Sequence, residues 1–212
     1  MVVAGAELRV VDVDAPAASP EVGERILDAA LDLVARWGVS KTALADVAKE
    51  AGCSRATLYR AFPGGKRHLL EALALRELAA YQGAVTEAMD GADSLADALT
   101  RGLVVGTRLL RDHAAAQFIL AHEPGLVLPF LGFGEMERLY RHMSPVLGAH
   151  LVRFLPADRA EWAAEWAARA FLSYLFNPHP EVDLADADDA RSLVTTFLLP
   201  ALQSPSLTPH RA

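Results

Sequence analysis

Residues 42–66, TALADVAKEAGCSRATLYRAFPGGK, decide how the rest of the chain is interpreted. They predict two short helices on either side of Gly52, because glycine tolerates the left-handed conformation that ends a helix. Thr42 and Ser54 are the predicted N-caps of the two helices. Polar and basic side chains project from the second helix, residues 55–62. Its predicted packing residues are Ala56, Leu58, Ala61 and Phe62.

Two helices of this length are not stable alone, so a third helix must support them. The preceding segment supplies it, since Ser19-Pro20-Glu21 combines a capping hydroxyl, a proline for the first turn and an acid near the positive helix end. Gly38 ends this helix. Its apolar residues recur at helical spacing and form the predicted floor of the domain: Val22, Ile26, Ala30, Leu33 and Trp37. Three such helices predict a helix-turn-helix domain for DNA.

The order of these features resembles the DNA-binding region of TetR-type (TetR/AcrR) transcriptional regulators. In that family a Thr-led helix, an Ala-Gly turn, a Ser-Arg-Ala-Thr-Leu-Tyr recognition helix and a Phe-Pro-x-x-Lys exit follow one another, and the match covers residues 19–74. Gly64-Gly65 departs from the pattern, so a looser exit turn is expected. The resemblance implies a homodimeric, ligand-released repressor of a pseudo-palindromic operator. The alternative is a small helical bundle with a glycine turn and another role.

The charge distribution favours DNA contact through this segment alone. The 212-residue chain has a formal net charge of −7. Residues 38–67 nevertheless contain six basic residues against two acidic ones, whereas residues 68–212 contain eleven against eighteen. A basic patch on an acidic protein is typical of a molecule that contacts phosphates with one end. The alternative is a solvated charged face.

The composition indicates an all-α protein without internal repeats. Apolar residues make up 52% of the chain, and no strand-like alternation occurs. We expect a cytoplasmic protein, because no membrane-spanning run or signal peptide is apparent and a lone Cys53 cannot form an internal disulfide. The expected organisation is a disordered arm over 1–18, the helix-turn-helix domain over 19–66, a helical ligand-binding and dimerisation domain over 67–203, and a tail over 204–212.

The second half predicts a linking helix from Lys66 to about Met89 and five further helices. Asp158 is the predicted cap of one of them, and Ser144-Pro145 predicts a kink or break in another. Gly102 and Gly106 on one helix indicate either close packing or room for a ligand. The further helices are expected over residues 95–110, 113–122, 135–155, 158–176 and 190–202.

Residues 126–133 are too apolar for an ordinary exposed loop, so we expect them to be buried or to line a cavity. Such walls suit a long acyl chain or an aromatic drug, with a Tyr, Gln117 or a His fixing a polar head. A fatty-acid-like effector is therefore our hypothesis, and plain core is the alternative for each residue. The candidate lining is Leu103, Gly106, Leu110, Gln117, Phe118, Leu128, Phe133, Met136, Tyr140, Met143, Phe171 and Tyr174.

Arg55 and Thr57 are the predicted base-reading residues, since Arg can contact guanine and the Thr methyl can contact thymine. The others are predicted mainly to hold phosphates, as the resemblance implies for the Tyr and the exit Lys. The candidate DNA-binding residues are Lys41, Thr42, Ser54, Arg55, Thr57, Tyr59, Arg60 and Lys66. The candidate dimer interface is Trp162, Trp166, Ala170, Leu193 and Phe197, forming a four-helix contact.

The sequence supports no catalytic constellation, and we expect no cofactor. The Gly64-Gly65-Lys66 segment is not a phosphate loop, because Arg60 and Arg67 stand where that motif requires Gly and Ser or Thr. The histidines lack metal-ligand spacing. The competing hypothesis is a helical lipid carrier or sensor that does not bind DNA, and salt-dependent DNA binding would separate the two.

Overall fold

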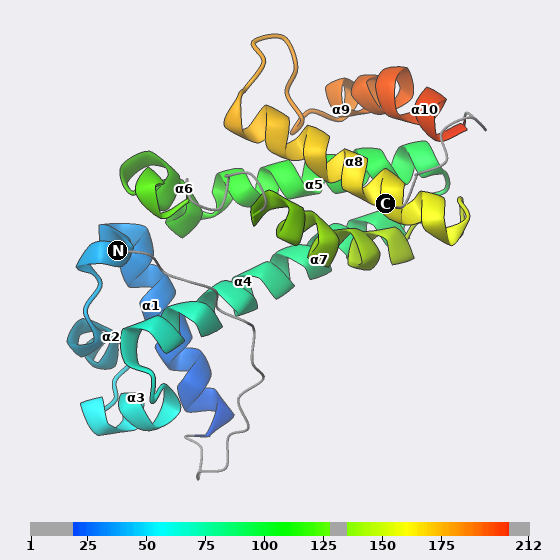
Figure 1. Cartoon of the computed structure of the whole chain (residues 1–212). Helices are drawn as coiled ribbons and strands as arrows, with labels where there is room; N and C mark the ends of the chain where they lie inside the picture. Colours follow the sequence, from blue (N-terminus) through cyan, green and yellow to red (C-terminus); the bar gives the residue numbers. More distant parts are fainter. Residues whose placement is uncertain (1–18, 128–134, 204–212) are drawn as a thin grey trace.

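The computed structural model describes residues 19–127 and 135–203, which form an all-α structure (Figure 1). A helix-turn-helix head of three helices lies at one end, and the predicted fold class is confirmed. The α-helices are α1 (Pro20–Lys41), α2 (Leu44–Glu50), α3 (Arg55–Ala61), α4 (Gly65–Asp90), α5 (Leu95–Asp112), α6 (Ala114–His122), α7 (Glu135–Ala149), α8 (Ala157–Phe176), α9 (Ala187–Leu193) and α10 (Leu199–Gln203). The turns η1 (Pro124–Leu126) and η3 (Val194–Leu198, π-helical) complete the elements.

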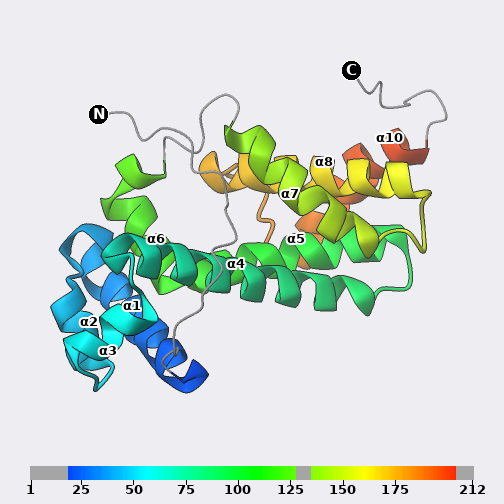
Figure 2. The ribbon, with the colours of Figure 1, turned by 60° about the horizontal axis from the view of Figure 1, so that its bottom comes forward.

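The molecule has two apolar cores, and α4 contributes to both. Leu69 and Leu73 of its first turns pack with α1, α2 and α3, around the fully buried Leu58. Val85 and Met89 of its last turns pack with α5, α8, α9 and η3. Figure 2 shows α4 running from the three-helix head alongside α5. Because burying one large aliphatic side chain is worth about 1.5–3 kcal/mol, each core holds its end of α4 firmly.

The chain changes direction within α1, at the glycine that the sequence analysis identified. Gly38 has φ 83° and ψ 170°, and the helical residues after it form a separate final turn. The Thr42 hydroxyl donates a hydrogen bond to the Gly38 carbonyl at 2.7 Å. Thr42 therefore caps the end of α1, and the prediction that it caps the next helix is wrong. Ala43 precedes α2 without a side-chain cap.

Two predicted packing positions in the head are wrong. Trp37 is 44% exposed instead of lying on the floor. Ala56 is exposed on α3, where the packing depends on Leu58, with Phe62 buried at the end of the helix. Both errors arise at the edge of an apolar stripe, where the helical period alone does not decide which neighbour covers a residue.

Helix boundaries in the second half differ from the prediction at three places. Pro145 lies inside α7 without ending it, and the helix stops at Ala149. Pro156 is the residue before α8, so Asp158 is in the first turn and caps nothing. The last helical segment begins earlier than expected because the Asp186 carboxylate accepts the Asp188 and Asp189 amides. No helix within the described ranges is long and apolar enough to cross a membrane.

Gly148 allows α7 and α8 to approach closely, and replacing it tests this packing. A Cβ atom there would lie 2.9 Å from Glu161 Cα. The Glu161 backbone, unlike a side chain, cannot rotate away from the added methyl group. Gly148→Ala is therefore expected to lower the free energy of unfolding by about 1–3 kcal/mol. Gly83→Ala on α4 is the control. Its Cβ would meet no atom within 4 Å, so it should gain roughly 0.5–1 kcal/mol. Urea unfolding measures both, and equal stabilities would contradict the packing argument.

Candidate DNA-binding surface and effector cavity

The recognition helix α3 is fixed by one cap and one apolar anchor. The Ser54 hydroxyl accepts a hydrogen bond from the Thr57 amide at 3.1 Å, as the sequence predicts for an N-cap. Such caps stabilise a helix by about 1 kcal/mol. Leu58 on the opposite face is fully buried in the head. The remaining face of α3 is therefore held outward in one orientation.

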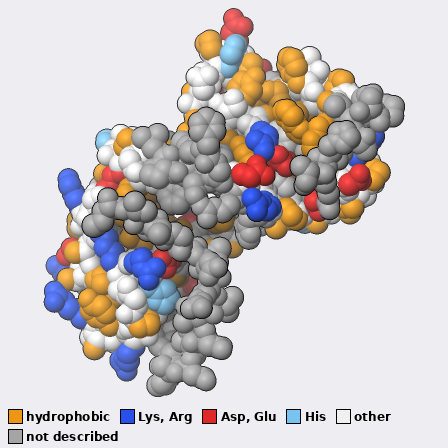
Figure 3. All heavy atoms as spheres, viewed as in Figure 1, with side chains coloured by type: hydrophobic (Ala, Val, Ile, Leu, Met, Phe, Trp, Pro, Cys, Tyr) orange, Lys and Arg blue, Asp and Glu red, His pale blue; other side chains and the backbone are white. Residues whose placement is uncertain are grey.

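Of the two cations on α3, Arg55 and Arg60, Arg55 is the one without an internal partner in the described part of the chain. It is exposed, and within the described residues it makes no hydrogen bond or ion pair. Tyr59 is 50% exposed beside it. Arg60 instead donates to the Thr57 hydroxyl at 3.3 Å, so those two side chains support each other. Figure 3 shows Lys and Arg side chains projecting around the head in the lower part of the view.

The basic residues flanking α3 lie on the same domain but differ in availability. Lys41 is exposed at the end of α1. The Lys66 ammonium donates to the Ser40 carbonyl at 3.3 Å, linking α4 to the end of α1. Thr42 is only 3% exposed and its hydroxyl is already bonded to Gly38. A phosphate contact by the Thr42 side chain, as predicted from sequence, conflicts with this burial.

A cavity of about 490 Å³ lies in the C-terminal half, between α4, α5, α7 and α8, and it reaches residues of α1 and α6. Five predicted lining residues face it: Leu103, Leu110, Tyr140, Met143 and Phe171. Its size is within the usual range of small-molecule sites. Leu128 and Phe133 lie outside the described residues, as does the side chain of Met136.

Four predicted lining residues do not line the cavity, each for a local reason. Gly106 lies against the Tyr81 hydroxyl, which a Cβ atom would approach to 2.6 Å. Gln117 donates to the Leu110 carbonyl at 2.8 Å. Phe118 reaches across to Gly38 of α1. Tyr174 packs against the core of the C-terminal half.

Helix α4 supplies the largest part of the wall that sequence reasoning missed. Its lining residues are Leu70, Leu73, Ala74, Glu77, Leu78, Tyr81, Val85 and Met89. They recur every three or four residues, which places them on one helix face. From the sequence, this pattern indicates only the packing face of a linking helix, because an apolar stripe that faces a cavity has the same period as one that faces core. Leu31, Val34 and Val39 of α1 also line the cavity.

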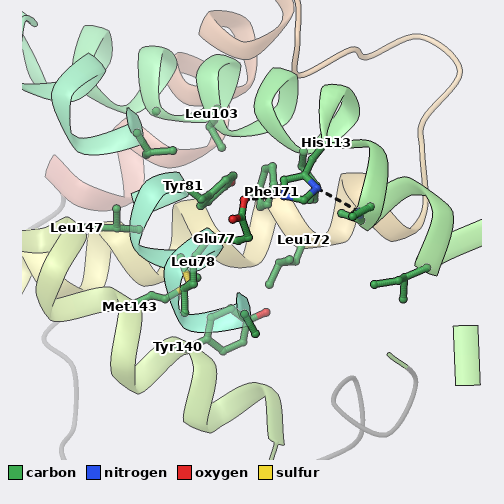
Figure 4. Close-up of a pocket in the computed structure, with 18 of the residues that line it drawn as sticks. Glu77, Leu78, Tyr81, Leu103, His113, Tyr140, Met143, Leu147, Phe171 and Leu172 are labelled. Carbon is green, nitrogen blue, oxygen red and sulfur yellow. Dashed lines mark hydrogen bonds and ion pairs between the residues drawn. The ribbon is translucent and has the colours of Figure 1, made fainter. Parts of the chain in front are cut away.

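A small polar cluster of Glu77, Tyr81 and His113 interrupts the apolar wall (Figure 4). His113 Nδ1 accepts the Ala116 amide at 3.1 Å, so its proton resides on Nε2. Nε2 lies 3.2 Å from Glu77 Oε2 and donates to it. Burial raises the pKa of Tyr81, so its phenol stays neutral. Within the described residues the Tyr81 hydroxyl has no hydrogen-bond partner.

Besides α4, a hydrogen-bonded contact joins the C-terminal half of the molecule to the helix-turn-helix head. Glu123, at the end of α6, accepts the Val39 amide at 2.6 Å and the Ser40 amide at 2.9 Å. We call this contact the Glu123 clasp. Partial burial alone would raise the pKa of Glu123, but the hydrogen bonds from Ser40 and Val39, with Lys66 nearby, hold that pKa below its usual value. Charged acceptors make the stronger class of hydrogen bond, so the clasp ties α6 to the end of α1.

The clasp predicts a pH-dependent stability difference. Because the folded-state pKa of Glu123 is lowered, its contribution is present above the unfolded pKa of ~4.3 and is lost as pH falls through the folded value. Wild type should exceed Glu123→Gln in unfolding free energy at pH 7, and the difference should shrink below roughly pH 4. Urea titrations at a series of pH values measure it. A difference independent of pH would contradict the charged clasp.

No group of three or more His, Cys, Asp or Glu side chains capable of holding a metal occurs in residues 19–127 and 135–203. The free Cys53 is half-buried in the turn before α3. The candidate functional surfaces of the described part are the polar face of α3 and the apolar cavity.

Comparison with known proteins identifies the family of the helix-turn-helix head. Residues 26–73 match the family model described as bacterial regulatory proteins, tetR family. The chain is 28% identical over 193 residues to the uncharacterized HTH-type transcriptional regulator MT1294 of Mycobacterium tuberculosis, covering 89% of each. It is 27% identical over 185 residues to the HTH-type transcriptional regulator AlkX of that species, covering 82% of this chain and 83% of the relative.

The fold has solved counterparts as well. The TetR family repressor AlkX from Dietzia sp. strain DQ12-45-1b, described as implicated in biodegradation of n-alkanes, superposes with a TM-score of 0.61 at 24% identity, covering 89% of this chain and all of that one. The relatives are transcriptional regulators, which removes the support for a lipid carrier that does not bind DNA. The helix-turn-helix head of this chain therefore matches the tetR family of bacterial regulatory proteins, and the relatives that the whole chain resembles are DNA-binding transcriptional regulators of that family.

Proposed function

We propose that this regulator is a homodimeric repressor that a hydrophobic small molecule releases from its operator. The observation that carries the proposal is the cavity, whose wall combines residues of the DNA-binding head with residues of the C-terminal half. Leu31, Val34 and Val39 of α1 contribute to the same wall as Phe171 of α8. A molecule that fills the cavity therefore contacts both parts at once.

The apolar wall favours a chain-like effector of the fatty-acid type. Leu, Val, Met, Ala and Phe side chains make up most of the lining, and Glu77 is the one Asp, Glu, Lys or Arg among the described lining residues. Each methylene moved from water to such a wall gains about 0.8 kcal/mol, so affinity should rise with chain length until the cavity is full. The n-alkane connection described for the Dietzia repressor is in keeping with this chemistry.

The mechanism that we propose is a change in the separation of the two heads. Recognition helices of a dimer read half-sites roughly 34 Å apart, so a changed spacing weakens operator binding. A ligand causes such a shift only if it binds the two spacings with different affinity. In this chain α4 and the Glu123 clasp are the two links through which filling the cavity would move α1 and the attached α3.

For DNA contact we propose the roles that the exposed side chains support. Arg55 and Thr57 read base edges from the first turn of α3, whose Ser54 cap sets their direction. Lys41, Tyr59, Arg60 and Lys66 hold phosphates around it. The proposed domain division is a head over 19–66 and an effector and dimerisation domain over 67–203. The proposed arm 1–18 and tail 204–212 lie outside the described residues.

The proposed dimer contact uses the apolar face formed by α8 and the last helical segment, where Figure 3 shows hydrophobic side chains gathered. Phe197 is 70% exposed, and Trp166 and Phe176 are exposed to 47% and 42%. Trp162 and Ala170 are half-buried beside them. Leu193 is wrong as an interface residue, because it is buried in its own core. Light scattering of wild type and Phe197→Glu tests this face, and a monomeric wild type would contradict it.

The effector proposal is tested by thermal shift and DNA release with apolar chains of graded length. At a ligand concentration of 100 times Kd, stabilisation of about 2.7 kcal/mol is expected. The same chains should dissociate the protein from its upstream operator in the order of their affinities. Phe171→Ala, which enlarges the cavity, should shift the preference towards longer chains. Absence of any shift at every chain length would overturn the effector proposal.

A further inference from the structure

We infer that the Glu77–Tyr81–His113 cluster selects effectors whose polar end donates a hydrogen bond and carries no negative charge, a primary alcohol fitting best. This inference rests on the proposed effector role of the cavity and specifies the head group of the chain. Figure 4 shows the three side chains near one another in a wall whose other labelled polar side chain is Tyr140. A polar head buried against the aliphatic part of that wall, away from this cluster and Tyr140, would lose its hydrogen bonds to water without replacement.

The charge around the cluster is negative. Arg76 is the cation nearest to Glu77 among the described residues, with Nη2 at 2.9 Å from Oε1. The same guanidinium also pairs with Glu24 at 3.1 Å and Asp28 at 2.7 Å. One positive charge is thus shared among three carboxylates. His113 adds none, because its Nδ1 accepts an amide hydrogen bond and the ring is neutral.

The cavity offers no cation to receive an anionic head. None of the lining residues in the described part of the chain is Lys or Arg. A fatty-acid carboxylate at this cluster would face the Glu77 carboxylate in a poorly solvated site, where like charges cost several kcal/mol. A fatty-acid-like alkyl chain suits this wall, but a free carboxylate is the wrong head group for it.

A hydroxyl group satisfies both unused hydrogen-bonding functions. Glu77 Oε2 receives only the His113 contact at 3.2 Å, so this oxygen can accept a second hydrogen bond. The Tyr81 hydroxyl has a proton to donate and no partner among the described residues. Glu77 and Tyr81 are four residues apart on α4 and face the same way. An alcohol donates to Glu77 and accepts from Tyr81, whereas an ether can only accept.

Calorimetric titration of the full-length dimer with decanol, decyl methyl ether and decanoate at neutral pH tests the inference. We expect decanol to bind roughly tenfold or more tightly than decanoate, with the ether in between. Glu77→Gln should bring decanol and decanoate within roughly threefold, because the repulsion is gone. Tyr81→Phe should weaken decanol while leaving the ranking of the other two unchanged.

The control is Glu87→Gln, which removes an exposed charge from the same helix outside the cavity lining. It should leave all three affinities as in wild type. Decanoate binding as tightly as decanol, or a preference that survives Glu77→Gln, would overturn the head-group inference while leaving the effector proposal standing. Failure of all three molecules to bind would remove both. Circular dichroism of each variant confirms that the compared proteins are folded.

Discussion

Replacing Arg55 by Ala is expected to weaken operator binding by about 1–3 kcal/mol, or roughly 5- to 150-fold, and to relax the preference at one base position. Arg55 starts α3 directly after the Ser54 cap, and Leu58 fixes the rotation of the helix. Its guanidinium is exposed and has no partner in the described part of the chain. No internal contact must break before it donates two parallel hydrogen bonds to a guanine.

Lys66→Ala is the matched comparison, because it removes one positive charge from the same domain without removing a planar donor. It should weaken operator and random DNA alike and reduce the slope of log affinity against log salt by about 1. Fluorescence anisotropy on both DNAs at several salt concentrations measures the two variants together. Equal losses on operator and random DNA for Arg55→Ala would mean that Arg55 holds a phosphate and reads no base.

The head was predictable because its signals are local. Gly52 has φ 62° at the turn, and Ser54 caps the helix that follows it. Both roles depend on residues within a few positions, so the residue types alone indicate them. The Thr42 error has the same origin. A hydroxyl beside two helix ends can cap either, and the close Gly38 carbonyl receives it.

The cavity was predictable only in part, because its wall is assembled from helices far apart in sequence. The residues of α5 and α7 were found through their apolar period, but the same period on α4 indicated core. Glu77 shows most clearly why the sequence alone does not identify every residue of the cavity wall. A single acid within an apolar helix face is an ordinary surface residue until the fold brings His113 to 3.2 Å from it. The Glu123 clasp spans 84 residues and leaves no local pattern.

Gly38→Ala is expected to lower the free energy of unfolding by about 2–4 kcal/mol and to weaken the link between cavity and head. Two costs combine. The backbone at φ 83° and ψ 170° lies in a region that essentially only glycine occupies. An added Cβ would also lie 2.7 Å from Phe118 Cε1 and 2.8 Å from Glu123 Cδ. Those side chains can move, but moving Glu123 breaks its hydrogen bonds to Val39 and Ser40.

Two comparisons separate these costs. Gly52→Ala adds the strain of a positive φ of 62° without any atom within 4 Å, so it should lose only about 1–2 kcal/mol. In a Glu123→Ala background, Gly38→Ala should cost less than in wild type, because no clasp is left to break. Urea unfolding of the four proteins of this cycle measures the coupling. Additive losses would mean that Gly38 serves only the backbone turn, and that α6 and α1 are joined by apolar packing alone.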